Sequence, residues 1–240
     1  MTSARALTVQ EAIDRIGFGR FQKRMLAVCG VTWAADGAEV LSLGFVLPSV
    51  IEDFGISPTR AGLIASATFA RMLVGAWFWG TISDYIGRRV GFQLTVLIFA
   101  LFGLLSAFAP GWEWLAILRF ITGFGLGGVL PLDFSLYAEF LPRDNRGRNV
   151  VLLESFWAVG TIMAAGLAWL LVPSSGWRPL LATSAVAAVL VLWIRRSVPE
   201  SPRYLAISGK VDEAKEILTR IAAVNGRPPA EQDLIGSPDL

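Results

Sequence analysis

Histidine is absent from the 240 residues, and cysteine occurs only once, as Cys29. Without histidine the chain lacks the usual proton carrier near neutral pH, so only carboxylates are left for that work. A single cysteine excludes an internal disulfide and any thiol pair. No nucleophilic side chain stands beside a candidate base. Soluble enzyme chemistry is therefore disfavoured, and we expect neither a cofactor nor a metal.

Charge is scarce as well, since charged residues make up 17% of the chain and hydrophobic residues 54%. Ordinary soluble domains are closer to 25% charged. The net charge of +2 is too small to indicate nucleic-acid binding. A secretory signal is not expected, because the first apolar run begins only after a polar segment of roughly two dozen residues. Most of the chain is expected to lie in lipid.

Six apolar stretches are long enough to cross the roughly 30 Å hydrocarbon core of a bilayer as helices rising ~1.5 Å per residue. They are expected near Met25–Val50, Thr59–Ser83, Val90–Ala109, Trp112–Leu136, Val150–Val172 and Arg178–Ile194. The fold class is therefore an all-α membrane protein with six transmembrane helices. Such a bundle can be built as two inverted groups of three helices, although the two groups share no evident sequence identity.

Basic residues are concentrated in alternate connectors. They occur in the N-terminal tail, at Arg88 and Arg89, at Arg143, Arg146 and Arg148, and at Arg195, Arg196 and Arg203. The other connectors hold only Arg60 and Arg178. By the positive-inside rule, both termini of a multi-pass protein of the cell membrane are expected in the cytoplasm.

The flanking segments are predicted to be cytoplasmic. Residues 1–24 mix apolar and basic side chains and indicate an amphipathic helix on the membrane surface before a bundle over residues 25–195. Residues 196–225 indicate a second amphipathic helix, centred on Glu200–Ala223. Residues 226–240 are rich in glycine and proline and are expected to form a disordered tail or a linker.

Three charged side chains lie where lipid is expected. Asp36 and Glu39 are near the middle of the first span, about 60° apart on one helix face. An ionised carboxylate costs a few kcal/mol there, so it faces the bundle interior, a water-filled cavity or a cation. The alternative is a pair that only locks helices together. Arg71 lies at the same depth of the second span, either paired with a carboxylate or substrate, or facing a cavity or another protomer.

The fourth span combines charge with small residues. Arg119, Gly123 and Asp133 lie within about 80° of one another on a helix. The small residues and the proline of this span are most often packing residues, which let neighbouring helices approach closely. They are Gly123, Gly125, Gly127, Gly128 and Pro131. The run superficially resembles a glycine-rich phosphate loop, but no strand precedes it.

Several motifs resemble those of the major facilitator superfamily. The turn Gly80–Arg89 is similar to its signature between the second and third helices, and Arg119–Pro131 to its fourth-helix signature. Further stretches are similar to the sugar-porter branch and to the metabolite:proton symporters related to synaptic vesicle protein 2. These stretches are Glu139, Arg146–Arg148 and Pro199–Leu205 for the first, and Gly17–Gln22, Asp36–Glu39 and Gly75–Gly80 for the second.

The resemblance implies roles for these residues. Asp36, Glu39 and Arg119 would couple protons to transport, because a carboxylate that alternates between an arginine and water binds protons differently in the two states. Arg71 and Asp133 would contact substrate. A network of charges and turn glycines would latch one conformation from the cytoplasm. Its members are Gly80, Asp84, Gly87, Arg88, Arg89, Glu139, Arg146, Glu200 and Arg203.

The chain departs from this family in two respects. Arg71 stands where a small residue is expected, and only one of two six-helix halves is present. The favoured hypothesis is the N-terminal half of a proton-coupled symporter for a small metabolite, such as an organic anion or a sugar-like compound. A second copy or a separate second half would complete it. The alternatives are a truncated or regulatory membrane protein that does not transport, and a facilitator that ignores protons.

Overall fold

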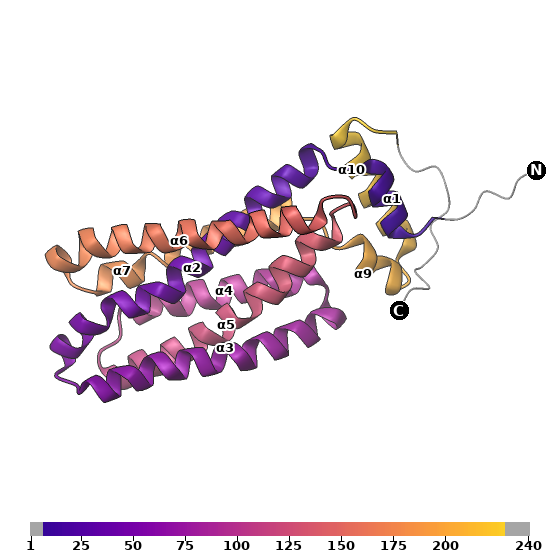
Figure 1. The fold of residues 1–240 in the computed structure, drawn as a ribbon. Helices are drawn as coiled ribbons and strands as arrows, with labels where there is room; N and C mark the ends of the chain where they lie inside the picture. Colours follow the sequence, from indigo (N-terminus) through magenta and orange to yellow (C-terminus); the bar gives the residue numbers. More distant parts are fainter. Residues whose placement is uncertain (1–6, 229–240) are drawn as a thin grey trace, which may run out of the picture.

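The computed structural model describes residues 7–228, and every regular element in that range is an α-helix. Figure 1 shows a bundle of long helices, with the short helices α1 (Val9–Ile16), α9 (Pro202–Ile207) and α10 (Val211–Asn225) gathered at one end. The helices are α1 Val9–Ile16, α2 Arg20–Phe54, α3 Pro58–Ile86, α4 Arg88–Ser106, α5 Trp112–Glu139, α6 Arg146–Ser175, α7 Arg178–Ala182, α8 Ala185–Ser197, α9 Pro202–Ile207 and α10 Val211–Asn225.

Within the described residues, six helical segments are long and apolar enough to cross a membrane, counting α7 and α8 as one. The prediction of an all-α protein with six transmembrane helices is therefore confirmed. The sixth span differs from expectation because it is interrupted at Thr183 and Ser184. Large apolar side chains on the outside, such as Trp169 and Val189, are exposed as lipid-facing residues would be.

Local signals explain where the helices begin and end. The αL conformation of Gly55 ends α2. Ser57 caps α3 by accepting a hydrogen bond from the Arg60 N–H, and Pro58 occupies the first turn. Gly87, with φ at 97°, is the single residue between α3 and α4, a conformation that favours glycine. The chain therefore reverses sharply at Gly87.

The helices pack in pairs, with α3 against α5, α2 against α6, and α4 between α5 and α8. Glycines permit this closeness. A Cβ at Gly160 of α6 would meet the Ala34 carbonyl oxygen of α2, and a Cβ at Gly127 of α5 would meet that of Met72 in α3. The hydrophobic effect does not drive helices together in lipid, so van der Waals contacts between closely packed backbones stabilise the bundle instead.

We call the end of the bundle where α2, α4 and α6 begin the basic end, and the opposite end the far end. At the basic end, α1 buries Val9, Ala12, Ile13 and Ile16 and contacts α9 and α10. The expected helix over Glu200–Ala223 is instead two helices, because Gly209 at φ +79° separates α9 from α10. Most of the predicted tail, 226–240, lies outside the described residues.

Candidate functional site

A buried ion pair joins the first and fourth spans. Nη1 of Arg119 in α5 lies 2.7 Å from Oε1 of Glu39 in α2. The two side chains are only 1% and 5% exposed, respectively. The two side chains stay together strongly, because separating them would leave a buried charge without a partner, at a high cost in free energy. Arg119 therefore pairs with Glu39, and no ion pair joins it to Asp36 among the described residues.

The remaining donors and acceptors of the pair are satisfied by α4 and by the start of α8. Nε of Arg119 donates to Ser106 Oγ at 2.9 Å, and its Nη2 donates to the Gly103 carbonyl at 3.1 Å. The Ser184 hydroxyl lies against the second carboxylate oxygen of Glu39. A Cβ at Gly103 would lie 2.6 Å from Ser184 Oγ and 2.9 Å from Glu39 Oε1. Glycine is therefore required there by the site itself.

The interruption of the sixth span places Ser184. Hydrogen bonds around it connect residues three apart, from the N–H of Ser184 to the Leu181 carbonyl at 3.2 Å and from that of Ala187 to the Ser184 carbonyl at 3.0 Å. This spacing tightens the helix, as often happens inside helices at functional positions. The tight turn directs the Ser184 hydroxyl into the bundle toward Glu39.

Asp36 lies one helical turn from Glu39 and lines a cavity of about 550 Å³. Asp36 is 2% exposed, and its Oδ1 has no hydrogen-bond partner among residues 7–228. Glu154 of α6 is exposed and lines the same cavity. No arginine or lysine lines the cavity among the described residues. Its other walls are aromatic or aliphatic, formed by Trp33, Val40, Phe69, Met72, Leu73, Ala76, Leu126, Gly127, Leu130 and Trp157.

Asp133 is fully buried in α5 and does not line this cavity. Neither of its carboxylate oxygens has a hydrogen-bond partner among the described residues. It interacts electrostatically with Cys29 and Asp36, both on α2. The predicted contact between Asp133 and a substrate therefore has no open route in this conformation.

Arg71 is stacked on aromatic rings of α5. Its guanidinium carbon lies 3.9 Å from the ring centroid of Phe120 and 5.3 Å from that of Phe124. No described carboxylate lies within ion-pair distance of Arg71, so the anticipated charge pair with Asp36 is not formed. Cation–π stacking lowers the cost of keeping this charge within the span.

Charges of the predicted gate meet at the basic end. Arg88 Nη2 lies 2.6 Å from Asp84 Oδ1, and its Nε lies 3.6 Å from Glu139 Oε1. Glu200 Oε1 accepts hydrogen bonds from the backbone N–H groups of Arg89 and Ser201, both at 3.0 Å. These contacts connect the turn after α3 to the end of α5 and to the segment before α9.

Other predicted gate residues are placed differently. Arg146 donates to Gln10 Oε1 at 2.6 Å and to the Leu141 carbonyl at 2.7 Å, so it binds α1 rather than a carboxylate. Arg203 lines a pocket beside Glu139. A Cβ at Gly87 would lie 2.5 Å from Glu200 Oε2, whereas one at Gly80 would meet nothing within 4 Å. Gly87 therefore makes room for Glu200, and Gly80 has no such steric reason.

The fourth-span glycines all face other helices. A Cβ at Gly123 would lie 2.5 Å from the Thr68 carbonyl oxygen, and one at Gly125 would lie 2.8 Å from the Phe99 backbone nitrogen. A Cβ at Gly128 would lie 2.5 Å from the indole of Trp79. Pro131 lies inside α5, one helical turn beyond Gly127. These small residues allow α5 to pack closely between α3 and α4.

Comparison with known proteins identifies the family. The sequence profile described as "Sugar (and other) transporter" matches residues 22–237. The chain belongs to this transporter family. It is 47% identical over 218 residues to organic cation/carnitine transporter 7 of Arabidopsis thaliana, covering 91% of this chain and 43% of that protein. It is 41% identical over 224 residues to the synaptic vesicle 2-related protein of Bos taurus, covering 92% of this chain and 40% of that protein.

The fold of this family member matches a solved transporter. The major facilitator proton:xylose symporter XylE, bound to 6-bromo-6-deoxy-D-glucose, aligns with a TM-score of 0.77 at 22% identity. The alignment covers 84% of this chain and 50% of XylE, which comes from E. coli. The six helices thus have the fold of the N-terminal half of a major facilitator protein, and the chain spans less than half the length of the curated relatives named above. Proteins of this family are transporters and not enzymes.

Sequence reasoning missed four residues of the candidate site. Glu154 is the only charged residue between Val150 and Val172, and a lone carboxylate in an apolar span is a signal for function. The other three, Gly103, Ser106 and Ser184, gave no such signal. They are ordinary small residues of apolar spans, and only the packing of α4 and α8 against Glu39 and Arg119 reveals them.

Proposed function

We propose that this chain forms the N-terminal six-helix half of a proton-coupled symporter for a small organic solute. The observation that carries the proposal is the buried Glu39–Arg119 pair, one turn away from the Asp36 cavity. Burying two charges away from water costs desolvation free energy. Ionisable groups that are nevertheless found within membrane spans usually mark ion or substrate pathways.

Proton binding to Glu39 would weaken its attraction to Arg119. The arginine would keep its bonds to Ser106 and the Gly103 carbonyl, while the neutral carboxyl group needs an acceptor for its new proton. The Ser184 hydroxyl can supply that acceptor, since it also donates to the Leu181 carbonyl at 2.7 Å. Both protonation states of Glu39 therefore find partners. The two states differ in how firmly α2 is held to α5, which lets a proton bias the conformational equilibrium.

The cavity favours an organic cation as the solute. Its two ionisable side chains, Asp36 and Glu154, are both acidic, and no basic residue lines it within the described part of the chain. Trp33, Phe69 and Trp157 supply aromatic faces, which attract quaternary ammonium and similar cations. We therefore propose an organic cation instead of the anion or sugar-like compound expected from the motifs. The name of the Arabidopsis relative, organic cation/carnitine transporter 7, agrees with this class.

The charges at the basic end would form the latch of the transport cycle. The contacts of Arg88 with Asp84 and Glu139, and of Glu200 with Arg89, join the α3–α4 turn to α5 and to the chain after α8. Exposed pairs are each worth about 1 kcal/mol or less, so the latch would release only when several contacts break together. By the positive-inside rule, this end of the membrane-embedded protein faces the cytoplasm.

A complete solute pathway would need a second six-helix unit opposite the cavity. Major facilitator proteins place the solute between two such halves. We propose that a second copy of this chain or another six-helix half closes the cavity around Asp36 and Glu154. The mass of the protein in nanodiscs distinguishes a homodimer from a monomer.

The proposal is tested by binding and uptake in reconstituted vesicles. Purified protein in nanodiscs is titrated with carnitine, choline, nicotinate and xylose, and quenching of tryptophan fluorescence reports binding near Trp33 and Trp157. Uptake of any solute that binds is then measured in proteoliposomes with and without an inward proton gradient. We expect choline and carnitine, which both carry a quaternary ammonium group, to bind, and their uptake to rise with the gradient.

Variants separate the candidate functions. Glu154→Gln and Asp36→Asn should weaken cation binding. Glu113→Gln, in the first turn of α5 at the far end of the bundle, should leave it unchanged. Uptake that ignores both the gradient and Glu39→Gln would establish the proton-independent facilitator instead. Folded, oligomeric protein that binds none of the four solutes would contradict the transport proposal and favour a non-transporting membrane protein.

A further inference from the structure

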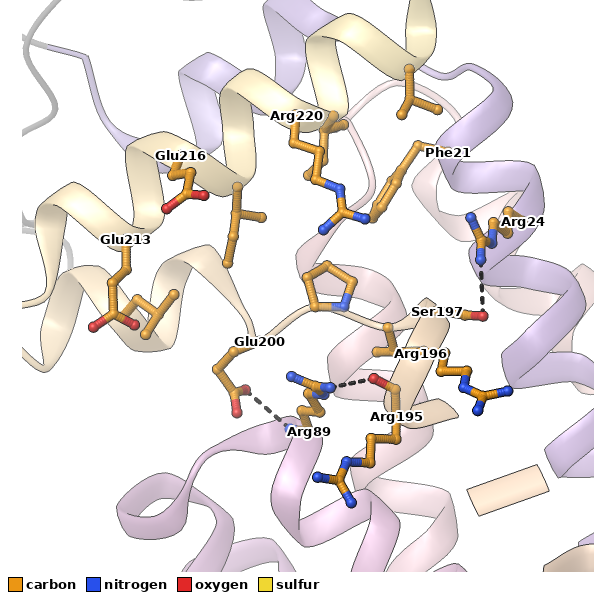
Figure 2. Close-up of a pocket in the computed structure, with 16 residues that line it drawn as sticks. Phe21, Arg24, Arg89, Arg195, Arg196, Ser197, Glu200, Glu213, Glu216 and Arg220 are labelled. Carbon is orange, nitrogen blue, oxygen red and sulfur yellow. Dashed lines mark hydrogen bonds between the residues drawn. The ribbon is translucent and has the colours of Figure 1, made fainter. Parts of the chain in front are cut away.

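Arginines from four helices line a second cavity, at the basic end and away from the Asp36 site. It has a volume of about 360 Å³ and lies between α10, the ends of α2 and α4, and the chain that follows α8. Figure 2 shows the basic side chains distributed around it, with α10 on one side and α4 and α8 on the other. The five arginines are Arg24, Arg89, Arg195, Arg196 and Arg220.

These arginines are not neutralised within the described part of the chain. None of the five lies within 4.0 Å of a described carboxylate oxygen, although Glu200, Glu213 and Glu216 also line the cavity. Glu200 Oε1 is occupied by the N–H groups of Arg89 and Ser201, and Glu213 pairs with Lys210 at 3.5 Å. In Figure 2, Glu213 and Glu216 lie along α10, well apart from Arg195 and Arg196.

Arg89 is the most constrained of the five. One of its terminal nitrogens donates to the Arg195 carbonyl, while its Nε is buried and has no hydrogen-bond partner in the part of the chain that the structure describes. Arg24 is similarly held, donating to Ser197 Oγ at 3.0 Å. Backbone and hydroxyl contacts thus hold two guanidinium groups beside the cavity without cancelling their charge. A buried unpaired donor and uncompensated positive charge indicate that an anion belongs here.

The position of the cavity identifies the kind of anion. The cavity lies where the spans α2 and α4 begin and where α8 ends, at the level expected for lipid headgroups. Apolar side chains line it as well, including Phe21, Ile217 and Ile221. Guanidinium groups match phosphate oxygens in geometry, and basic pockets between transmembrane helices are suited to anionic headgroups. A soluble anion would not need the apolar wall.

We propose that this cavity binds the phosphate of an anionic phospholipid, and that the bound headgroup holds α10 against α4 and α8. The arginines come from opposite sides, with Arg220 on α10 facing Arg89 on α4 and Arg195 at the end of α8. Without an anion these charges repel across the cavity, and a phosphate between them turns repulsion into attraction. Because Glu200 and Arg89 also belong to the proposed latch, the lipid stabilises the latched state. This site does not depend on what the protein transports.

The experiment compares lipid dependence in nanodiscs. Wild-type protein is placed in phosphatidylcholine alone or in phosphatidylcholine with phosphatidylglycerol, and bound lipid is counted by native mass spectrometry. Thermal stability and hydrogen exchange of α10 are measured in parallel. We expect retained phosphatidylglycerol, a higher melting temperature and slower exchange in α10 only when the anionic lipid is present.

Arg220→Gln and Arg195→Gln test the cavity against general surface charge. Each should lower the affinity for phosphatidylglycerol by more than the about fivefold expected for one basic residue near an anionic surface. Arg148→Gln is the matched control, because Arg148 is exposed at the same end and outside the cavity. In phosphatidylcholine alone, the variants and wild type should melt alike, which separates loss of lipid binding from misfolding.

Three results would overturn the proposal. The first is equal loss of lipid affinity in Arg148→Gln, which would reduce the effect to surface charge. The second is full protection of α10 by inorganic phosphate or glycerol phosphate in phosphatidylcholine discs, which would make this a soluble-anion site. The third is unchanged exchange of α10 when phosphatidylglycerol is added.

Discussion

Glu39→Gln removes one charge of the buried pair and leaves the Arg119 guanidinium, 1% exposed, without a counter-charge. Breaking a buried pair from one side costs about 3–5 kcal/mol. For a chain of this size, that cost corresponds to a fall in melting temperature of roughly 6–20 °C. Thermal unfolding in nanodiscs, followed by tryptophan fluorescence, measures the fall directly.

Asp53→Asn is a matched control for Glu39→Gln. Both changes turn a carboxylate of α2 into an amide, and both carboxylates lie 2.7 Å from an arginine nitrogen. Asp53 and Arg178 are each 44% exposed, so their pair is screened by water. Asp53→Asn should therefore lower the melting temperature by no more than roughly 4 °C.

The double variant Glu39→Gln, Arg119→Met tests whether the loss of stability comes from the unpaired charge of Arg119. It removes both charges, so most of the stability lost in Glu39→Gln should return, since replacing a whole buried pair is often neutral. The reasoning would be refuted if Glu39→Gln behaved like Asp53→Asn, or if the double variant melted below the single one.

Three further predictions concern Gly103 beside this pair, the buried Asp133 and the turn residue Gly87. Gly103→Ala should lower the melting temperature and the proton dependence of uptake together, because the methyl group displaces Ser184 and Glu39; both are read in the same vesicle preparation. Asp133→Asn should leave solute binding unchanged and keep or raise the melting temperature, since a buried carboxylate without donors contributes no favourable contact. Gly87→Ala should destabilise the protein by about 1 kcal/mol or more, from the strained φ and the crowding of Glu200, as measured by thermal unfolding.

The helical architecture was predictable from the sequence because lipid imposes it. Apolar runs of bilayer length, separated by charged or glycine-containing turns such as Gly87, leave few alternatives to membrane-spanning helices. The interruption at Ser184 was not predictable, because Pro179 lies at the start of the span and the run from Leu180 to Ile194 around Thr183 and Ser184 holds no proline or glycine. Likewise the division at Gly209 was missed, because apolar periodicity continues on both sides of that glycine.

The candidate site was predictable in its charges but not in its partners. Charged residues stand out in an apolar span, so Asp36, Glu39 and Arg119 were identifiable. Which carboxylate meets Arg119 depends on how each helix is rotated, and tertiary packing sets that rotation. The same argument applies to Arg71, whose aromatic partners on α5 are recognisable only when α3 and α5 are placed together.

The most direct test of proton coupling through Glu39 is proton entry into proteoliposomes on addition of a solute that binds. A pH-sensitive dye in the lumen reports proton movement while uptake of the labelled solute is followed in parallel. The account predicts that wild-type protein acidifies the lumen in proportion to uptake, whereas Glu39→Gln still binds solute but moves no protons. Equal acidification by the Glu39→Gln variant, or solute entry in wild type without acidification, would contradict it.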